Sequence, residues 1–283
     1  MRKSIQLREE ECLEKMMAYA NEAGFSEIAI GFGSSDIFAR EDYERAVDKI
    51  RNMLEIHDLV CRQTHLPCYH LLISSEETQE AMEKTIIRCI EASAMLGAEW
   101  TAYHPRTSLT DGYNRTTSYK TNQEALSSYL EYAEKYGVGI AVENMPLYPY
   151  IHPEWRFFGG GWEELCELCD SFDTDKIGIC WDFGHAHTAS LDQTLALKDI
   201  GNRLKITHVH DNYRNGDHHQ LPGLGNLEDW GCIDWAKTMQ AVKTIDYNGP
   251  MTLELIIPPE PMTKSFVQCG YDSLCYLENL KNT

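Results

Sequence analysis

Six residues of the types that bind divalent metals each stand at the end of a short apolar run in the sequence. The first four recur at intervals of 39 residues, a spacing that suits one strand and the helix after it. The six are His65, His104, Glu143, Asp182, His210 and Glu254. Imidazole and carboxylate groups together suit ions such as Mn²⁺, Fe²⁺, Co²⁺ and Zn²⁺. If the six run ends meet at one place, the sequence predicts a metal centre there.

Three more residues of these types lie in the segments that follow. His185 comes three positions after Asp182, and Asp217 and His219 lie in the long segment beyond His210. One such residue is often only a helix cap or a hydrogen-bonded core residue. Six strand ends in register are harder to explain in that way. We therefore treat His185, Asp217 and His219 as additional candidates for metal or substrate ligands.

His208 and His210 are two residues apart in an expected strand, so both side chains point to the same face. His210 is nearer the strand end, and we expect it to be the metal ligand. We expect His208 to be a buried, hydrogen-bonded residue beneath it. His187 and His218 are expected to be solvated or to support the ligands.

Eight apolar runs alternate with eight helical patterns along the chain. The expected strands are 4–7, 27–32, 59–65, 100–104, 139–143, 177–182, 205–210 and 251–254. The expected helices are 10–23, 43–56, 77–96, 121–136, 163–171, 191–204, 235–245 and 266–280. Each helix supplies the crossover that a parallel strand pair needs.

The alternation predicts an α/β fold, a closed (β/α)8 TIM barrel formed by one domain over residues 1–283. An open doubly wound sheet is the main alternative. Such a sheet requires a glycine-rich phosphate turn after an early strand, and the segment from Gly31 to Asp36 matches that turn poorly. In a barrel the carboxyl ends of the strands surround one mouth, which is where the six candidate ligands would meet.

The chain has 283 residues with 25 Lys and Arg against 44 Asp and Glu, a formal charge of −19. Such an acidic surface repels nucleic-acid phosphates and anionic lipids unless a local patch or bound cations reverse its sign. No apolar run approaches the roughly 18–20 residues of a membrane span. The polar residues after Met1-Arg2-Lys3 do not fit a signal peptide. We expect a cytoplasmic protein with no membrane partner, and nucleic acid is disfavoured.

The ten cysteines are scattered through apolar patterns, which is typical of reduced core residues in a long chain without a secretion signal. Cys166 and Cys169 form one C-x-x-C, and their spacing puts both on one face of an expected helix. No second C-x-x-C or histidine pair completes a zinc site around them. We interpret them as residues of a buried helix face.

At these positions the chain resembles the xylose isomerase-like TIM-barrel superfamily. This superfamily contains sugar epimerases and isomerases, inosose dehydratases and the endonuclease IV type of apurinic-site nuclease. The resemblance covers nearly the whole chain, and its motifs are specific for the superfamily but not for one substrate. The motifs are Val142-Glu143-Asn144, Asp182-Phe183-Gly184-His185, His208-Val209-His210, Pro222-Gly223-Leu224-Gly225 with Asp234-Trp235 after it, and Leu253-Glu254.

The resemblance implies two different ligand sets. In the ketose 3-epimerase members one metal is held by residues that match Glu143, Asp182, His210 and Glu254, the two glutamates act as acid and base, and the match of His185 touches substrate. In the nuclease members nine ligands hold three zinc ions, and all nine have counterparts here. These counterparts are His65, His104, Glu143, Asp182, His185, His210, Asp217, His219 and Glu254.

We favour a metal-dependent sugar or sugar phosphate isomerase or epimerase. Glu143 and Glu254 would move a proton next to a carbonyl, and a metal would stabilise the enediolate that forms. His185 would orient a hydroxyl, with His65 and His104 as supporting or substrate contacts. The expected cofactor is one divalent ion, Mn or Zn, with Co, Fe or Mg as alternatives and up to three ions.

Substrate contacts outside the metal ligands are expected from basic and aromatic residues near the mouth. Arg106 and Arg214 follow the fourth and seventh expected strands and could meet a substrate phosphate. Trp155 lies in an aromatic segment, residues 146–161, which either caps a sugar or packs over the barrel rim or against a second subunit. A carbohydrate is the expected partner, and a homo-oligomer is left open.

A multi-zinc phosphodiester hydrolase is the alternative, and the nine matched ligands favour it. The charge of −19 and the lack of a basic stripe weigh against it. The nuclease members carry a lysine shortly after the seventh-strand histidine, whereas this chain has Asp211-Asn212-Tyr213-Arg214 there. A catalytically silent barrel that binds sugar or metal would require an incomplete ring of ligands.

Overall fold

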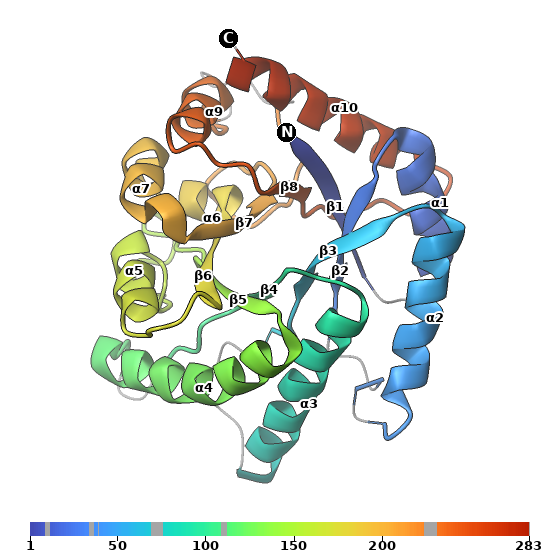
Figure 1. Ribbon diagram of the computed structural model, residues 1–283. Helices are drawn as coiled ribbons and strands as arrows, with labels where there is room; N and C mark the ends of the chain where they lie inside the picture. The colour runs from blue at the N-terminus through green and yellow to red at the C-terminus, as the bar shows by residue number, and fades with distance from the viewer. Residues whose placement is uncertain are drawn as a thin grey trace.

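The computed structural model describes residues 1–8, 12–33, 37–38, 40–68, 76–108, 112–223 and 231–282. This part of the chain forms a closed barrel of eight parallel strands in sequence order (Figure 1). The strands are β1 (Arg2–Arg8), β2 (Glu27–Gly31), β3 (Val60–His65), β4 (Trp100–Tyr103), β5 (Gly139–Glu143), β6 (Ile177–Asp182), β7 (Leu204–Val209) and β8 (Pro250–Leu253). β1 also pairs with β8, from Arg2 opposite Pro250 to Ile5 opposite Leu253. The predicted TIM barrel is confirmed, and the open sheet is excluded.

Helices surround the barrel on its outside (Figure 1). They are α1 (Leu13–Ala23), α2 (Tyr43–Ile56), α3 (Glu76–Met95), α4 (Arg115–Tyr136), α5 (Trp162–Asp170), α6 (Phe183–Thr188), α7 (Gln193–Ile200), α9 (Trp235–Thr244) and α10 (Thr263–Asn282), with a 3₁₀ turn at Gly201–Arg203. In α2 the buried residues Tyr43, Val47, Ile50 and Leu54 recur at helical spacing. Such stripes pack against the strands, and the polar faces point to water.

Three elements differ from the expectation. α4 starts at Arg115 rather than 121, because the Asn114 side chain accepts a hydrogen bond from the Thr117 backbone N–H. The short helix α6 directly after β6 was not expected. The expected helix 191–204 ends at Ile200, because Gly201 has φ +53° and the chain turns there before β7. Residues 34–36 of the segment from Gly31 to Asp36 and residues 224–225 of the Pro222-Gly223-Leu224-Gly225 motif lie outside the described residues.

Small apolar side chains fill the barrel interior below the mouth. Ala102, Ala141, Cys180 and Ile206 form one buried cluster there. Three of these stand two residues before Glu143, Asp182 and His208, so they form the layer beneath those side chains. The polar side chains at the mouth therefore pack against a buried apolar layer.

The first strand is tied to the last helix by ion pairs. The Glu278 carboxylate of α10 lies 2.6 Å from the Met1 amine and 2.5 Å from Lys3 Nζ. Cys169 is buried in α5 with its thiol near the Gly178 carbonyl, and Cys166 is half-buried on the same helix. Among the described helices, none combines the length and the apolar character needed to cross a membrane.

Candidate metal centre

All nine candidate ligands lie at the carboxyl end of the barrel. His65, Glu143 and Asp182 end β3, β5 and β6, while His104, His210 and Glu254 come directly after β4, β7 and β8. α6 contributes His185, and the segment between β7 and α9 contributes Asp217 and His219. Together with His208, Cys68 and Cys180, the nine candidate ligands form five overlapping groups in which the ligand atoms lie within 4.8 Å of one another.

Three of these groups together contain all nine candidate ligands. The central group is Glu143, Asp182, His208 and Glu254; the outer group is His185, His210, Asp217 and His219; the thiol group is His65, Cys68 and His104.

The central group brings three carboxylates around one histidine. His208 Nδ1 lies 3.0 Å from Glu143 Oε1, 3.3 Å from Glu254 Oε2 and 3.9 Å from Asp182 Oδ2. Glu143, Asp182 and His208 are completely buried. The sequence interpretation expected His208 to be a buried, hydrogen-bonded residue beneath His210, and His208 is buried and hydrogen-bonded here. His210, the expected ligand, lies against Asp182 with Nε2 at 3.1 Å.

The hydrogen bonds around His208 run in one direction. The Thr252 hydroxyl donates to Gln63 Oε1 at 2.8 Å, and the Gln63 amide N–H donates to His208 Nε2 at 2.9 Å. His208 then carries its proton on Nδ1 and donates to Glu143. A protonated nitrogen has no lone pair for a metal. In this arrangement His208 is a buried hydrogen-bond donor that orients Glu143.

Neighbouring histidines keep the central carboxylates ionised. Burial raises the pKa of Glu143, but the imidazoles of His208 and His104, which lie against its carboxylate, outweigh burial and hold this pKa well below its usual value. Burial likewise raises the pKa of Asp182, and His185 and His210 lower it further than burial raises it. Three anions in so small a buried space attract additional positive charge.

His210 packs against a glycine of the Asp182-Phe183-Gly184-His185 motif. A Cβ atom at position 184 would overlap the His210 ring, so only glycine leaves room for it. His210 Nε2 lies 3.1 Å from Asp182, and 3.6 Å from Asp217. Its Nδ1 is buried and has no hydrogen-bond partner among the described residues. His210 thus joins the central and outer groups.

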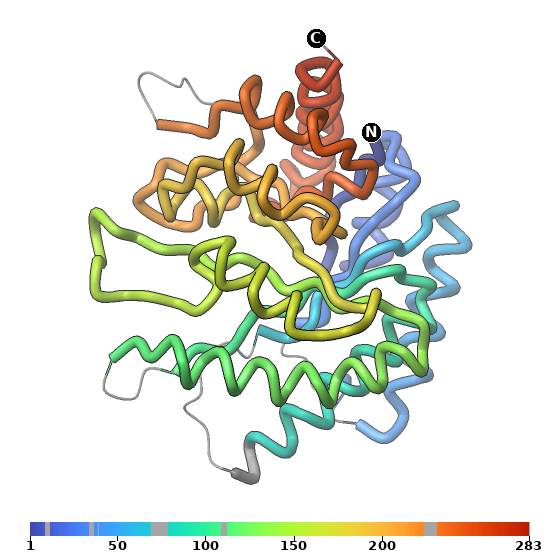
Figure 2. The backbone as a smooth tube through the Cα atoms, turned by 60° about the vertical axis from the view of Figure 1, so that its left-hand side comes forward, coloured from blue at the N-terminus to red at the C-terminus, as the bar shows by residue number. Residues whose placement is uncertain are grey.

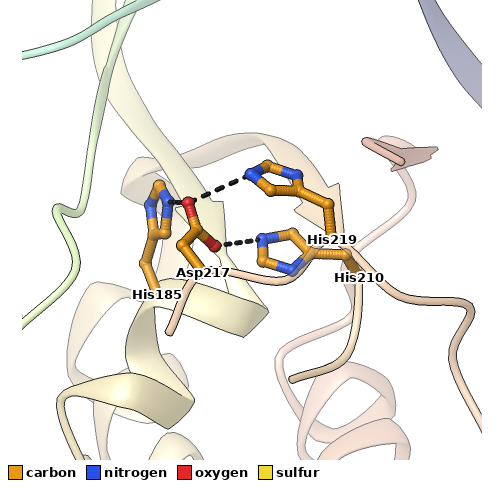
Figure 3. Close-up of side chains that lie close together, drawn as sticks. All are labelled: His185, His210, Asp217 and His219. Atoms are coloured by element: carbon orange, nitrogen blue, oxygen red, sulfur yellow. Dashed lines mark hydrogen bonds and ion pairs between the residues drawn. The ribbon is translucent and has the colours of Figure 1, made fainter. Parts of the chain in front are cut away.

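The outer group is arranged around Asp217 (Figure 3). Asp217 Oδ2 lies 3.2 Å from His185 Nε2 and 3.0 Å from His219 Nε2. Burial lowers the pKa of His185, but the carboxylates of Asp182 and Asp217 raise it to about 10. His219 has φ +47°, a left-handed conformation that is strained for histidine and that typically accompanies functional sites.

Asn144, the residue after β5, fixes both Asp182 and His185. Its side-chain oxygen accepts from the Asp182 backbone N–H at 2.6 Å, and its amide donates to the Asp182 carbonyl at 2.9 Å. Its own carbonyl accepts from His185 Nδ1 at 2.8 Å. The Asp182 side chain in turn caps α6 through the His185 N–H at 2.6 Å. The unexpected helix α6 is therefore the element that positions His185.

Three histidines share a feature that suits metal coordination. His65, His185 and His219 each donate Nδ1–H to a backbone carbonyl, those of Leu66, Asn144 and Glu254, at 2.6–2.8 Å. These bonds set the tautomer and turn the Nε2 lone pair toward the groups. A divalent cation that displaces the Nε2 protons of these histidines would meet imidazole nitrogens and ionised carboxylates together, so the side chains fit such a cation by the chemistry of their donors.

Two of the three predicted substrate contacts are engaged elsewhere. Arg106 is buried, with its guanidinium 2.6 Å from both Tyr129 and Glu83. Arg214 is exposed, and its Nε lies 3.3 Å from His187 Nε2. Trp155 is half exposed and stacks on His152 at 4.1 Å, in a segment that extends away from the barrel at the left of Figure 2. The structure brings none of the three into the metal-ligand groups.

A cavity of about 390 Å³ opens beside the central group, between the end of β1 and the segment after β8. Its lining includes Gln6, Arg8, His219, Glu254, Ile256 and Ile257. Gln6 Nε2 donates to Glu254 Oε1 at 2.7 Å, which places this glutamate at the cavity wall. The sequence interpretation missed Gln6 and Arg8; a polar Gln6 between the apolar Ile5 and Leu7 was the available signal.

Comparisons with known proteins identify the family of the chain. A family described as xylose isomerase-like TIM barrel matches residues 17–268. An uncharacterised protein of Methanocaldococcus jannaschii, MJ1311, is 30% identical over 188 residues, which cover 62% of this chain and 58% of that protein. An inosose isomerase of Bacillus velezensis is 26% identical over 146 residues, which cover 49% and 47%. The matches thus span less than two thirds of these relatives' own lengths.

A solved structure of a D-tagatose 3-epimerase-like protein has the same fold. It superposes with a TM-score of 0.74 over 100% of this chain and 98% of its own, at 20% sequence identity. Since the family match covers most of the sequence, the chain belongs to the xylose isomerase-like TIM barrel family.

Proposed function

We propose that the protein is a divalent-metal-dependent isomerase or epimerase of a sugar or sugar phosphate. The observation that carries this proposal is the convergence of Glu143, Asp182 and Glu254, three carboxylates in one group, beside a cavity of about 390 Å³. This volume lies within the ~300–1,000 Å³ range of small-molecule sites. We assign the cation to Glu143, Asp182, His210 and Glu254.

A cation held there supplies positive charge beside the substrate oxygen that becomes negative when a neighbouring carbon loses its proton. Glu254 lines the cavity and is oriented by Gln6, so it can reach that carbon-bound proton. Glu143 is buried and accepts a hydrogen bond from His208. It ends β5, which is three strands away from β8 in the barrel. One glutamate removes the proton, and the other returns it from a different side. His185 orients a hydroxyl of the substrate.

The comparisons support a carbohydrate substrate. One matched relative is an inosose isomerase, and one structure with the same fold is of a D-tagatose 3-epimerase-like protein. Both printed names refer to polyhydroxylated carbonyl compounds. The apolar Ile256 and Ile257 beside the polar Gln6 and Glu254 suit the mixed faces of such a molecule.

Solvent deuterium exchange tests the proposal. Ketoses are incubated with the metal-loaded protein in deuterated water, and incorporation at carbon is followed by NMR. We expect exchange with the wild-type protein and its loss in Glu254→Gln. Glu99→Gln is the matched control, because Glu99 precedes β4 at the opposite end of the barrel and pairs with Arg2 and Arg62. Equal exchange in the Glu254→Gln and wild-type proteins would contradict the assignment.

A multi-zinc phosphodiester hydrolase is the second candidate, because the structure gathers all nine matched ligands at one mouth. Neither Arg106 nor Arg214 adds a free basic group to the three metal-ligand groups. Metal content per chain, measured by plasma mass spectrometry, separates the candidates. One or two equivalents with ketose exchange favour the isomerase, whereas three equivalents with cleavage of an abasic-site oligonucleotide favour the hydrolase. Absence of bound metal after addition of Mn²⁺ or Zn²⁺ would overturn both and leave a silent barrel.

A further inference from the structure

Cys68 lies at the mouth of the barrel beside two histidines. It is three residues beyond His65, the last residue of β3, and its side chain is exposed. Its sulfur and one nitrogen each of His65 and His104 lie within 4.8 Å of one another. A thiol and two imidazoles at this separation form a donor set for a transition metal.

The two imidazoles of the thiol group point toward a shared position. His65 and His104 each place Nε2 3.2 Å from the same atom, Glu143 Oε2. His65 donates its Nδ1–H to the Leu66 carbonyl at 2.6 Å, so its Nε2 lone pair faces inward. Glu143 Oε2 therefore borders this position from the inside, while Cys68 borders it from the solvent side.

We propose that Cys68 is a metal ligand, and that its thiolate, His65 and His104 hold a cation with Glu143 as the fourth donor. Sulfur ligands favour Zn²⁺ and Co²⁺ over Mg²⁺ and Mn²⁺, because thiolate is a soft donor. Glu143 is shared with the cation assigned above, so the inference rests on the proposed function. His65, His104 and Glu143 already match ligands of the nuclease members, and the inference adds the thiolate of Cys68 and the metal preference that comes with it.

Four protein donors leave this cation without the open position that catalytic zinc sites keep for water. Its role is therefore to hold Glu143 in place beside the central group, and not to activate a water molecule. The thiol group would then contribute nothing to the water activation that a phosphodiester hydrolase requires.

Cobalt spectroscopy tests the inference. Metal-free protein is titrated with Co²⁺, and the visible ligand-field bands and the near-ultraviolet thiolate-to-cobalt charge-transfer band are recorded. We expect both sets of bands in the wild-type protein. Cys68→Ser should lose the charge-transfer band and keep ligand-field bands from the remaining sites. Cys12→Ser is the control, because Cys12 is also exposed and lines the cavity at the mouth.

A second measurement needs no variant. Iodoacetamide alkylation of Cys68 is followed by peptide mass spectrometry, with and without Zn²⁺. We expect Zn²⁺ to slow alkylation of Cys68 several-fold and to leave Cys269, an exposed cysteine of α10, unchanged. Ligand-field bands without a charge-transfer band, or unprotected Cys68, would overturn the inference and leave the proposed function standing. Failure to bind any Co²⁺ would overturn both the inference about Cys68 and the proposed metal-dependent function.

Discussion

The central and outer groups differ in what holds them. The carboxylates of the central group stand at or directly after β5, β6 and β8, so the barrel itself fixes them. Asp217 and His219 of the outer group lie in a connecting segment, and His219 adopts a strained backbone conformation. The central group is rich in carboxylate and the outer group in imidazole. The barrel thus fixes the carboxylates at the centre, and the connecting segment supplies Asp217 and His219 of the outer group.

Removing a central carboxylate should have the largest effect. Glu143→Gln removes one proton-transfer group and one ligand, and we expect kcat to fall by about 10²–10⁴-fold. Metal analysis should show loss of the central cation together with the one bound by the thiol group, because Glu143 borders both. A variant with wild-type kcat and full metal content would show that the barrel centre is not the reaction site.

Removing the centre of the outer group should have a smaller effect. Asp217→Asn weakens the contacts with His185, His219 and the proposed ligand His210, and we expect the metal affinity of the central site to fall by about 10–100-fold. At saturating metal the central cation should remain, and ketose exchange should persist at a reduced rate. Isothermal titration with Zn²⁺ and the exchange assay measure the two effects. Complete loss of exchange would mean that the two groups act as one unit.

The packing of Gly184 against the His210 ring, which lies between the central and outer groups, can be changed without replacing any of the proposed ligands. Gly184→Ala inserts a methyl group into the His210 ring position, and overpacking of this kind costs about 1–3 kcal/mol. Urea unfolding of the metal-free protein measures the change. Gly33→Ala is the control, since a Cβ there meets no atom within 4 Å and should leave stability nearly unchanged. Equal midpoints for the two variants would contradict the described packing of His210.

Removing the ion pairs of Glu278, which lie outside both groups, should have the smallest effect on stability. Lys3 and the Met1 amine lower the pKa of Glu278, so its stabilising contribution is present above the unfolded pKa near 4.5 and is lost as pH falls through the folded pKa. We expect Glu278→Gln to cost about 1 kcal/mol or less at pH 7. The wild-type and variant proteins should converge in stability below about pH 4. Urea unfolding at pH 7 and pH 3.5 checks this, and a constant difference would contradict it.

The strand-end ligands could be predicted from the sequence because the barrel period places one strand end per 39 residues at a common mouth. His65, Glu143 and Asp182 all end strands as expected. The pairing of His208 with the carboxylates could not be predicted, since it depends on Gln63 and Thr252, far away in sequence. Cys68 was missed because a loop cysteine carries no periodic signal. The metal ligand assignments and the predicted contacts of Arg214 and Trp155 stay predictions.

Asn144 has a consequence for the thermodynamics of cation binding. Its side chain extends the β5–β6 hydrogen bonding past the last ladder pair, and its carbonyl holds the His185 ring. Asp182, a proposed ligand, and His185, a proposed substrate contact, are therefore ordered before an ion or a substrate binds. Conformational entropy that a flexible site would lose on binding has already been lost during folding. The affinity of the centre should accordingly reflect coordination chemistry more than the ordering of the polypeptide.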